Sequence, residues 1–290
     1  MSNYVILTDS CCDLTQQMAD QLGLEVLPLT VSSPQGDFRN YLDHREVSPE
    51  TFYGYMRAGD MCKTSAVNLE QWAEAMEEIM KSGKDILCLA FSSGLSSTYS
   101  SAAIAAQELS EKYPERKVYA IDTLCASMGQ GMIVYLAAKK QQAGATIEEV
   151  RDWVEENKMS VAHWITVDDL MHLKRGGRVS ATTAVVGTML KIKPVLHVND
   201  EGKLETMEKA RGRKAALNML VDKMGETAIN IAEQEVFISH GDCLADAEYV
   251  AAKVKERFGV KAVHINYIGP VIGAHAGPGT VAVFWLATKR

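Results

Sequence analysis

Residues 85–112 read DILCLAFSSGLSSTYSSAAIAAQELSEK, and this stretch indicates the class of fold. Its first part, Asp85–Phe91, is a continuous apolar run, which is typical of a strand covered by helices on both faces. Ser92–Gly94 then predict a sharp turn, and Leu95–Lys112, rich in Ala and Ser, predicts a long helix. A buried strand, a turn and a helix in this order form one unit of a parallel α/β sheet.

The same alternation of strands and helices extends to both sides of this unit. Tyr4–Leu7 and Leu24–Val31 predict strands before it, Ser33–Val47 predicts a polar loop, and Lys117–Ile121 predicts a strand after it. Helices are predicted after the caps Asp13, Ser48 and Asn68, and over Ala126–Ala143 and Thr146–Asn157. Residues 1–160 are therefore predicted to form a doubly wound domain with a parallel sheet.

Residues 161–290 predict a second α/β domain, in which the sheet is mixed. Val161–Val167 predicts its first strand, and Asn199–Gly202 predicts the turn of a β-hairpin between Pro194–Val198 and Lys203–Lys209. Further elements are expected in this order: a short helix from Asp168, a helical stretch from Ser180, a helix near Lys214–Met224, a strand Glu235–Ser239, a helix near Leu244–Phe258, a strand Val260–Tyr267, a tight glycine-rich segment Gly269–Gly279 and a last strand Thr280–Leu286. The ligand site is expected between the two domains.

Length and composition are those of an ordinary globular protein. The 290 residues, 47% hydrophobic, fit two domains of roughly 100–200 residues each. The net charge of −7 argues against a dedicated nucleic-acid binder, and no apolar run is long enough for a membrane span. Six scattered cysteines without a C-x-x-C pair and an N-terminus without a signal pattern predict a reduced, cytoplasmic protein.

Small polar residues follow the ends of several predicted strands. In a parallel α/β sheet these ends bind ligands, because helix N-termini direct unpaired N–H groups toward them. We expect a site for a small anion at Thr64 and Ser65 and at Ser92, Ser93 and Gly94. A single Ser at a helix start is most often only a cap, but the number of hydroxyl groups here exceeds what capping requires.

The sequence contains no recognisable catalytic or metal-binding motif. Gly94-Leu95-Ser96-Ser97-Thr98 lacks the second Gly of G-x-S-x-G, the P-loop and G-x-G-x-x-G patterns are absent, and no His spacing suits zinc. We therefore assign no catalytic residue and no metal. A stand-alone phosphotransferase or hydrolase that uses Asp9, Ser93 or His275 is one alternative to a binding protein without catalysis, and a regulatory or interaction protein is another.

The second half adds a basic segment and one histidine in an unusual context. Leu170–Asn199 holds five basic residues and no acidic one, and this concentration in an acidic protein favours docking of an anionic partner. His275 lies in the Gly269–Gly279 segment, where small neighbours allow close approach to a ligand, although a lone His is by default structural.

Taken together, these motifs resemble the DegV family, bacterial fatty-acid-binding proteins that serve a fatty acid kinase. The resemblance rests on motifs in the family's order: Thr8-Asp9-Ser10 with Asp13-Leu14, Lys63-Thr64-Ser65, FSSGLSSTY from Phe91, LKRGGRVS from Leu173, IKPVL from Ile192, and IGPVIGAHAGPG from Ile268. They span nearly the whole chain, which makes the match specific.

The resemblance implies a carrier that buries one long-chain fatty acid of the palmitate, stearate or oleate class. It implies that Thr64 or Ser65, Ser92 or Ser93, and His275 hold the carboxylate between the domains. It further implies a separate fatty acid kinase that phosphorylates the bound acid, no cofactor, and a role of Arg175, Arg178 and Arg211 as contacts for the partner or the phosphate. A transient contact with a membrane surface is compatible with this role.

Overall fold

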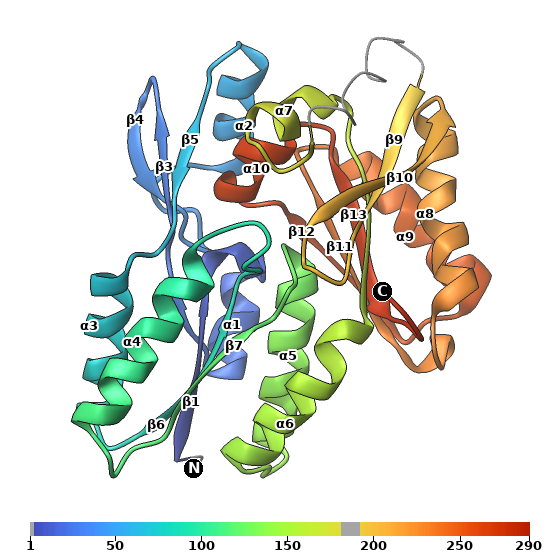
Figure 1. The fold of residues 1–290 in the computed structure, drawn as a ribbon. Helices are drawn as coiled ribbons and strands as arrows, with labels where there is room; N and C mark the ends of the chain where they lie inside the picture. Colours follow the sequence, from blue (N-terminus) through green and yellow to red (C-terminus); the bar gives the residue numbers. More distant parts are fainter. Residues whose placement is uncertain (1–2, 181–191) are drawn as a thin grey trace.

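The computed structural model describes residues 3–180 and 192–290 and consists of three sheets with helices around them (Figure 1). The helices are α1 Gln16–Leu22, α2 Pro49–Arg57, α3 Leu69–Lys81, α4 Thr98–Lys112, α5 Met128–Gln142, α6 Ile147–Asn157, α7 Leu170–Arg175, α8 Arg213–Thr227, α9 Leu244–Phe258 and α10 Pro270–Ala276. No helix in these two ranges is both long and apolar enough to cross a bilayer.

The first sheet is the parallel sheet expected from the sequence. Its strand order is β2-β1-β6-β7, and all its pairings are parallel; the strands are β1 Tyr4–Asp9, β2 Glu25–Leu27, β6 Asp85–Ala90 and β7 Val118–Asp122. Leu87 and Leu89 pack with α5 and α6, whereas Ile86 and Cys88 pack with α3 and α4. Helices on both faces explain why the β6 segment is apolar without alternation, and they confirm the doubly wound arrangement.

The second large sheet is mixed, as expected. Its order is β10-β9-β8-β13-β11-β12, and only β11 and β12 pair in parallel; the strands are β8 Val161–Thr166, β9 Ile192–Val198, β10 Leu204–Arg211, β11 Glu235–His240, β12 Ala262–Tyr267 and β13 Val281–Leu286. Helices α8 and α9 cover one face, and α5 contacts the other. The predicted hairpin is confirmed as β9–β10, with Gly202 in the left-handed conformation at φ 72°.

One core cluster joins the two large sheets through α5. It includes Ile6 of β1, Ile133 and Val134 of α5, and Phe284 of β13. The expected domain boundary coincides with Val161, the first residue of β8. Because α5 packs on both sheets, the division into residues 1–160 and 161–290 as separate domains stays a prediction.

A third, small antiparallel sheet was not expected. Its order is β4-β3-β5, with β3 Thr30–Ser33, β4 Gly36–Arg39 and β5 Lys63–Ser65. The prediction of one strand over Leu24–Val31 is therefore wrong, because the chain leaves the first sheet at Pro28, which has no N–H group for a strand ladder. The predicted polar loop from Ser33 likewise contains β4, which forms a hairpin with β3.

Three local expectations differ from the structure. Thr15, not Asp13, caps α1, because Asp13 lies two residues earlier, where it is buried in the left-handed conformation. Helix α4 begins at Thr98 rather than Leu95. The glycine-rich segment contains the helix α10, which has Pro270 at its first position. The helical stretch expected after Ser180 lies outside the described residues.

Candidate functional site

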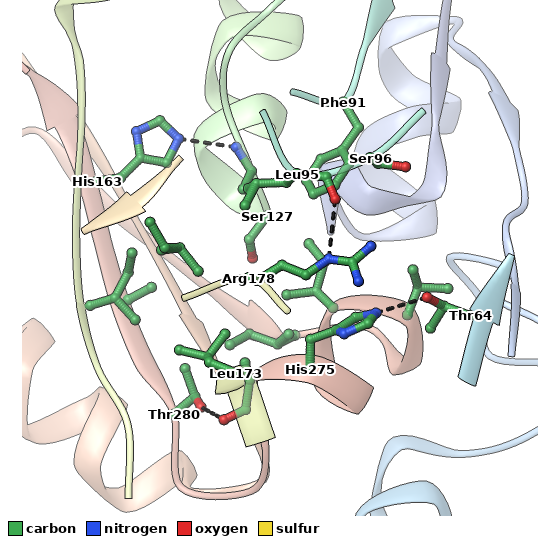
Figure 2. A pocket seen from close by; sticks show the side chains of 18 of the residues that line it. Thr64, Phe91, Leu95, Ser96, Ser127, His163, Leu173, Arg178, His275 and Thr280 are labelled. Carbon is green, nitrogen blue, oxygen red and sulfur yellow. Dashed lines mark hydrogen bonds between the residues drawn. The ribbon is translucent and has the colours of Figure 1, made fainter. Parts of the chain in front are cut away.

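A cavity lies between the two large sheets and is the candidate functional site (Figure 2). Strands β8 and β13 form one side of it, while β5, the β6–α4 and β7–α5 loops, α7 and α10 contribute the remainder. Its volume is about 190 Å³, more than ten times the roughly 10–15 Å³ that a single water molecule needs. The cavity can therefore hold a ligand with many heavy atoms.

Most of the cavity wall is apolar. Its large apolar side chains include Leu29, Phe91, Ile165, Val167, Leu173, Ile268, Val271 and Phe284. All of these are buried, with Ile165 the most accessible of them at 9%. A wall of this kind favours an apolar ligand, because binding removes the apolar surface of both the ligand and the wall from water.

Three polar side chains of the cavity, Thr64, Arg178 and His275, gather at one end. Thr64 Oγ1 and His275 Nε2 are 2.8 Å apart and come from β5 and α10. The guanidinium of Arg178 lies beside them in Figure 2, and its Nε donates to the carbonyl of Leu95 at 3.2 Å. Burial, with a smaller contribution from Arg178, lowers the pKa of His275 to about 4. At neutral pH this end therefore holds a neutral imidazole, a hydroxyl and one positive charge.

Glycine residues allow the backbone to approach this polar end closely. A Cβ atom at Gly176 would lie 2.3 Å from His275 Nδ1, and one at Gly273 would lie 2.6 Å from the Tyr53 hydroxyl. Gly176 follows α7, and Gly273 is in the middle of α10, so α10 is held between α7 and α2. The position of His275 therefore depends on the absence of side chains at these two residues.

Polar groups elsewhere in the cavity are bonded within the protein. The Nε2 atom of His163 accepts from the Ala126 N–H at 3.1 Å, and its Nδ1 atom is 2.8 Å from the Val161 carbonyl. Thr280 Oγ1 donates to the carbonyls of Ala276 and Gly277. Because these polar atoms already have partners within the protein, His163 and Thr280 do not require hydrogen bonds from a ligand. This part of the cavity therefore suits a hydrocarbon chain.

Ser127 also lines the cavity and is bonded on both sides. Its Oγ donates to Asp13 Oδ2 at 2.5 Å and lies 2.8 Å from Ser239 Oγ. In Figure 2 Ser127 and His163 lie on the other side of Arg178 from Thr64. The polar end and the remainder of the cavity are thus separate regions.

The predicted carboxylate ligands are only partly brought together. Thr64 and His275 meet, whereas Ser65, Ser92, Ser93 and Gly94 do not line the cavity that the described residues form. Ser92 Oγ donates to the carbonyl of Gly202 at 2.8 Å, and the Ser93 N–H donates to Asp122 Oδ1 at 3.1 Å. A role of these serines as ligands stays a prediction.

Two serines that we did not select line the cavity in their place. Ser96 and Ser97 come from the same FSSGLSSTY segment, and Ser96 Oγ is 2.9 Å from Thr98 Oγ1. The start of α4 explains the difference, since residues 91–97 form an irregular turn that directs its second pair of serines to the cavity. Sequence reasoning had placed these residues inside the helix.

The three selected arginines lie in different environments. Arg178 lines the cavity and is partly buried, which lowers its pKa from the usual value. Arg175, the last residue of α7, is exposed, and its Nη2 atom is 3.1 Å from His172 Nδ1. Arg211, the last residue of β10, is exposed as well. Only Arg178 is therefore placed to contact a ligand in the cavity.

The part of the chain that the structure describes shows no candidate metal site. Within residues 3–180 and 192–290 no group of three or more His, Cys, Asp or Glu side chains is arranged to hold a metal ion. All six cysteines lie in these ranges and are free thiols.

Fold and cavity together define an α/β protein with two large sheets and, between them, a largely apolar cavity that is polar at one end. The chain matches the family described as "Uncharacterised protein, DegV family" over residues 3–288, and it belongs to this family. A DegV domain-containing protein of Clostridium perfringens is 46% identical to it over 100% of this chain and 99% of the relative.

Solved structures of DegV proteins have the same fold. A fatty-acid-binding protein of the DegV family from Thermus thermophilus is 30% identical, with a TM-score of 0.88, over 98% of this chain and 99% of that chain. A fatty acid binding protein from Bacillus subtilis is 27% identical, with a TM-score of 0.86, over 99% of this chain and 100% of that chain. The predicted family membership and fold class are thereby confirmed.

Proposed function

We propose that this protein binds one long-chain fatty acid in the cavity between its two large sheets, with the carboxylate at Thr64, His275 and Arg178. The observation that supports this most strongly is the asymmetry of the cavity, which is polar at one end and otherwise apolar or internally bonded. The fatty acid binding stated for the DegV relatives from T. thermophilus and B. subtilis supports the same ligand class.

The hydrocarbon chain supplies most of the binding free energy in this proposal. Burial of each CH₂ contributes about 0.8 kcal/mol, so a palmitate, stearate or oleate chain contributes roughly 10 kcal/mol before the entropy cost of binding. Phe91, Ile165, Val167 and Phe284 are among the side chains that would cover it. Tail burial gives affinity, and the polar end gives orientation.

The carboxylate is proposed to bind donors at the Thr64 end. The N–H groups of the Arg178 guanidinium and the hydroxyls of Thr64 and Ser96 can donate hydrogen bonds to it. His275 shares a hydrogen bond with Thr64 and so orients that hydroxyl. We place the carboxylate here rather than at Ser92 or Ser93, because neither of these serines lines the cavity that the described residues form.

We further propose that the protein is a carrier that presents the fatty acid to a separate fatty acid kinase in the cytoplasm. Thr64 and Arg178 are partly exposed and Ser97 is exposed, so the carboxylate end lies near the surface, where a second protein can reach it. Exposed Arg175 and Arg211 are proposed as contacts for that kinase. The free cysteines support a reducing compartment.

Native mass spectrometry of the purified protein, before any lipid removal, tests fatty acid binding. We expect one bound species whose mass matches a long-chain fatty acid and which organic extraction releases. After removal of the lipid, added oleate should restore the same stoichiometry. A protein that purifies at its bare mass and takes up no oleate would contradict the proposal.

Incubation of the lipid-free protein with ATP and oleate distinguishes a carrier from an enzyme. We expect no acyl phosphate and no ADP until a fatty acid kinase is added. Turnover by the protein alone would support the alternative of a stand-alone phosphotransferase. In the presence of the kinase, Arg175→Glu should lower the rate of phosphorylation while oleate affinity is retained, because Arg175 lies outside the cavity.

A further inference from the structure

The Thr8-Asp9-Ser10…Asp13 motif at the end of β1 has no part in the binding site as described so far. All four residues are buried, and none lines the cavity of the described residues. The carboxylate of Asp9 accepts from the N–H groups of Cys11 and Phe91 and from Gln130 Nε2, so these side-chain contacts lie within the first half of the fold. Asp13 differs from it, since two of its partners, Asn266 and Gly269, lie in the second half of the fold.

Asp13 accepts hydrogen bonds from three segments, two of which contribute to the wall of the cavity. Its Oδ1 atom accepts from the Gly269 N–H at 2.9 Å, and its Oδ2 atom accepts from Ser127 Oγ at 2.5 Å. Its backbone carbonyl accepts from Asn266 Nδ2 at 2.8 Å. The three donors come from the start of α10, the start of α5 and β12, so one residue joins both halves of the fold.

Two of these donors support the wall of the cavity directly. Ser127 lines the cavity itself, and Gly269 immediately precedes Pro270, the first residue of α10. Helix α10 carries His275, and it also contributes Val271, Ile272 and Ala276 to the wall. Since a short helix moves as a unit, the contact at its first turn also fixes the direction of its last turn.

The contact between Asp13 and α10 leaves no spare room. A Cβ atom at Gly269 would lie 2.8 Å from Asp13 Oδ1 and 2.9 Å from Asn40 Nδ2. Burial raises the pKa of Asp13 to about 7, and the hydrogen bonds from Ser127 and Gly269 oppose that rise. The carboxylate is thus stabilised mainly by the same two donors that it holds in place.

We propose that Asp13 is a positioning residue for the fatty acid site, which holds α10 and Ser127 so that His275 meets Thr64. This inference rests on the proposed function for its ligand, but not for its geometry. In this role Asp13 supports the binding site from behind its wall and does not touch the ligand. A purely structural Asp13 would affect stability alone.

Two readouts on Asp13→Asn test the inference, with Thr8→Val as the matched control. Thr8 belongs to the same motif and is equally buried, but its hydroxyl donates to the Leu89 carbonyl and accepts from Gln130 Nε2, and neither partner lies on α10. The first readout is the ring resonances of His275 in the lipid-free protein, followed by NMR. The second is the affinity for oleate, measured by calorimetry. Unfolding in urea gives the stability of each variant.

We expect Asp13→Asn to shift the His275 resonances and to weaken oleate binding by about tenfold, the scale of one lost charge-assisted hydrogen bond. Thr8→Val should change neither readout, even where it lowers stability. Gly269→Ala acts on the same contact from the side of α10 and should reproduce the effects of Asp13→Asn if that variant does not fold.

Unchanged His275 resonances and unchanged oleate affinity in both Asp13→Asn and Gly269→Ala would overturn the inference. Failure of the wild-type protein to bind oleate would instead contradict the proposed function. The resonances of His275 would still decide the role of Asp13 in that case, because they are recorded without a ligand.

Discussion

His275 is the residue on which the polar end of the cavity depends. Its imidazole is neutral at pH 7, because burial and the nearby Arg178 lower its pKa to about 4, and it shares a hydrogen bond with Thr64. A carboxylate bound beside it would favour the protonated imidazole and thus raise this pKa. The histidine can therefore report where the headgroup binds.

The direction of the pH effect follows from this shift. If the pKa of His275 is higher with ligand than without, binding takes up a proton, and oleate affinity rises as the pH falls through the pKa of the complex toward the pKa of the free protein. The gain ends near pH 4, where the free protein is protonated as well. NMR titration of the His275 ring with and without oleate checks this, and identical titration curves would place the headgroup elsewhere.

Gly176 tests the same site through sterics alone. Its backbone has φ −72°, so alanine is allowed there, yet the added Cβ would lie 2.3 Å from His275 Nδ1. We expect Gly176→Ala to displace His275 and to weaken oleate binding by about tenfold or more, in line with the sensitivity of sites to ångström-scale misplacement. Gly54→Ala, with nothing within 4 Å of the new Cβ, is the control and should leave the affinity unchanged.

At the residue scale, the sequence identified types of chemistry better than exact positions. Thr64 and His275 were predicted from strand-end and glycine-rich patterns, and the structure brings them together. Ser96 and Ser97 were missed, because the first residue of α4 decides which serines of the segment face the cavity. That boundary depends on packing between distant segments, which local patterns do not report.

At the scale of elements, the turn at Ser92–Gly94 packs against the turn of the β9–β10 hairpin. Ser92 Oγ donates to the Gly202 carbonyl, and a Cβ atom at Gly94 would lie 2.4 Å from the carbonyl of Glu201. These contacts lie between the first and second halves of the fold. The SSG motif thus has a structural explanation in addition to the ligand role predicted from the sequence.

We therefore expect Ser92→Ala to lower mainly stability and Thr64→Val to lower mainly oleate affinity. Ser92→Ala leaves the Gly202 carbonyl without its hydroxyl partner and should cost about 1–3 kcal/mol of unfolding free energy, with little change in oleate affinity. Thr64→Val should weaken oleate binding and largely keep stability. Urea unfolding and calorimetry measure both. A loss of oleate affinity in Ser92→Ala at unchanged stability would restore Ser92 as the ligand.

Elements with strong local signals were predicted well, and those set by distant contacts were not. Asn68 and Thr146 each form a capping box, and Leu244–Phe258 forms α9 with the predicted bounds. In contrast, α10 has only seven residues, and two of them, Gly273 and His275, do not favour a helix by themselves. It is stabilised by packing against α2 and α7, which no local pattern shows.

At the scale of the whole molecule, the cavity exists because two sheets share one central helix. The core cluster around α5 joins residues of both sheets, and the space that they leave above it is lined by β8, β13 and α10. A ligand that fills this space should link the two halves of the fold. Binding to the folded state alone stabilises it by mass action.

Thermal unfolding should therefore depend on the length of the acyl chain. Oleate at about 100 times its Kd should add about 2.7 kcal/mol to the stability of the lipid-free protein. Butyrate, which has the same carboxylate but little tail to bury, should add almost nothing at equal concentration. Equal shifts of Tm with both acids would show that the apolar cavity is not where the ligand binds.

A crystal structure of the protein loaded with oleate tests the central claim most directly. The account predicts one oleate between the two large sheets, with its carboxylate within hydrogen-bond distance of Thr64 and the Arg178 guanidinium, and with its tail along Ile165 and Phe284. A carboxylate bound at Ser92 and Ser93, or an oleate outside this cavity, would contradict it.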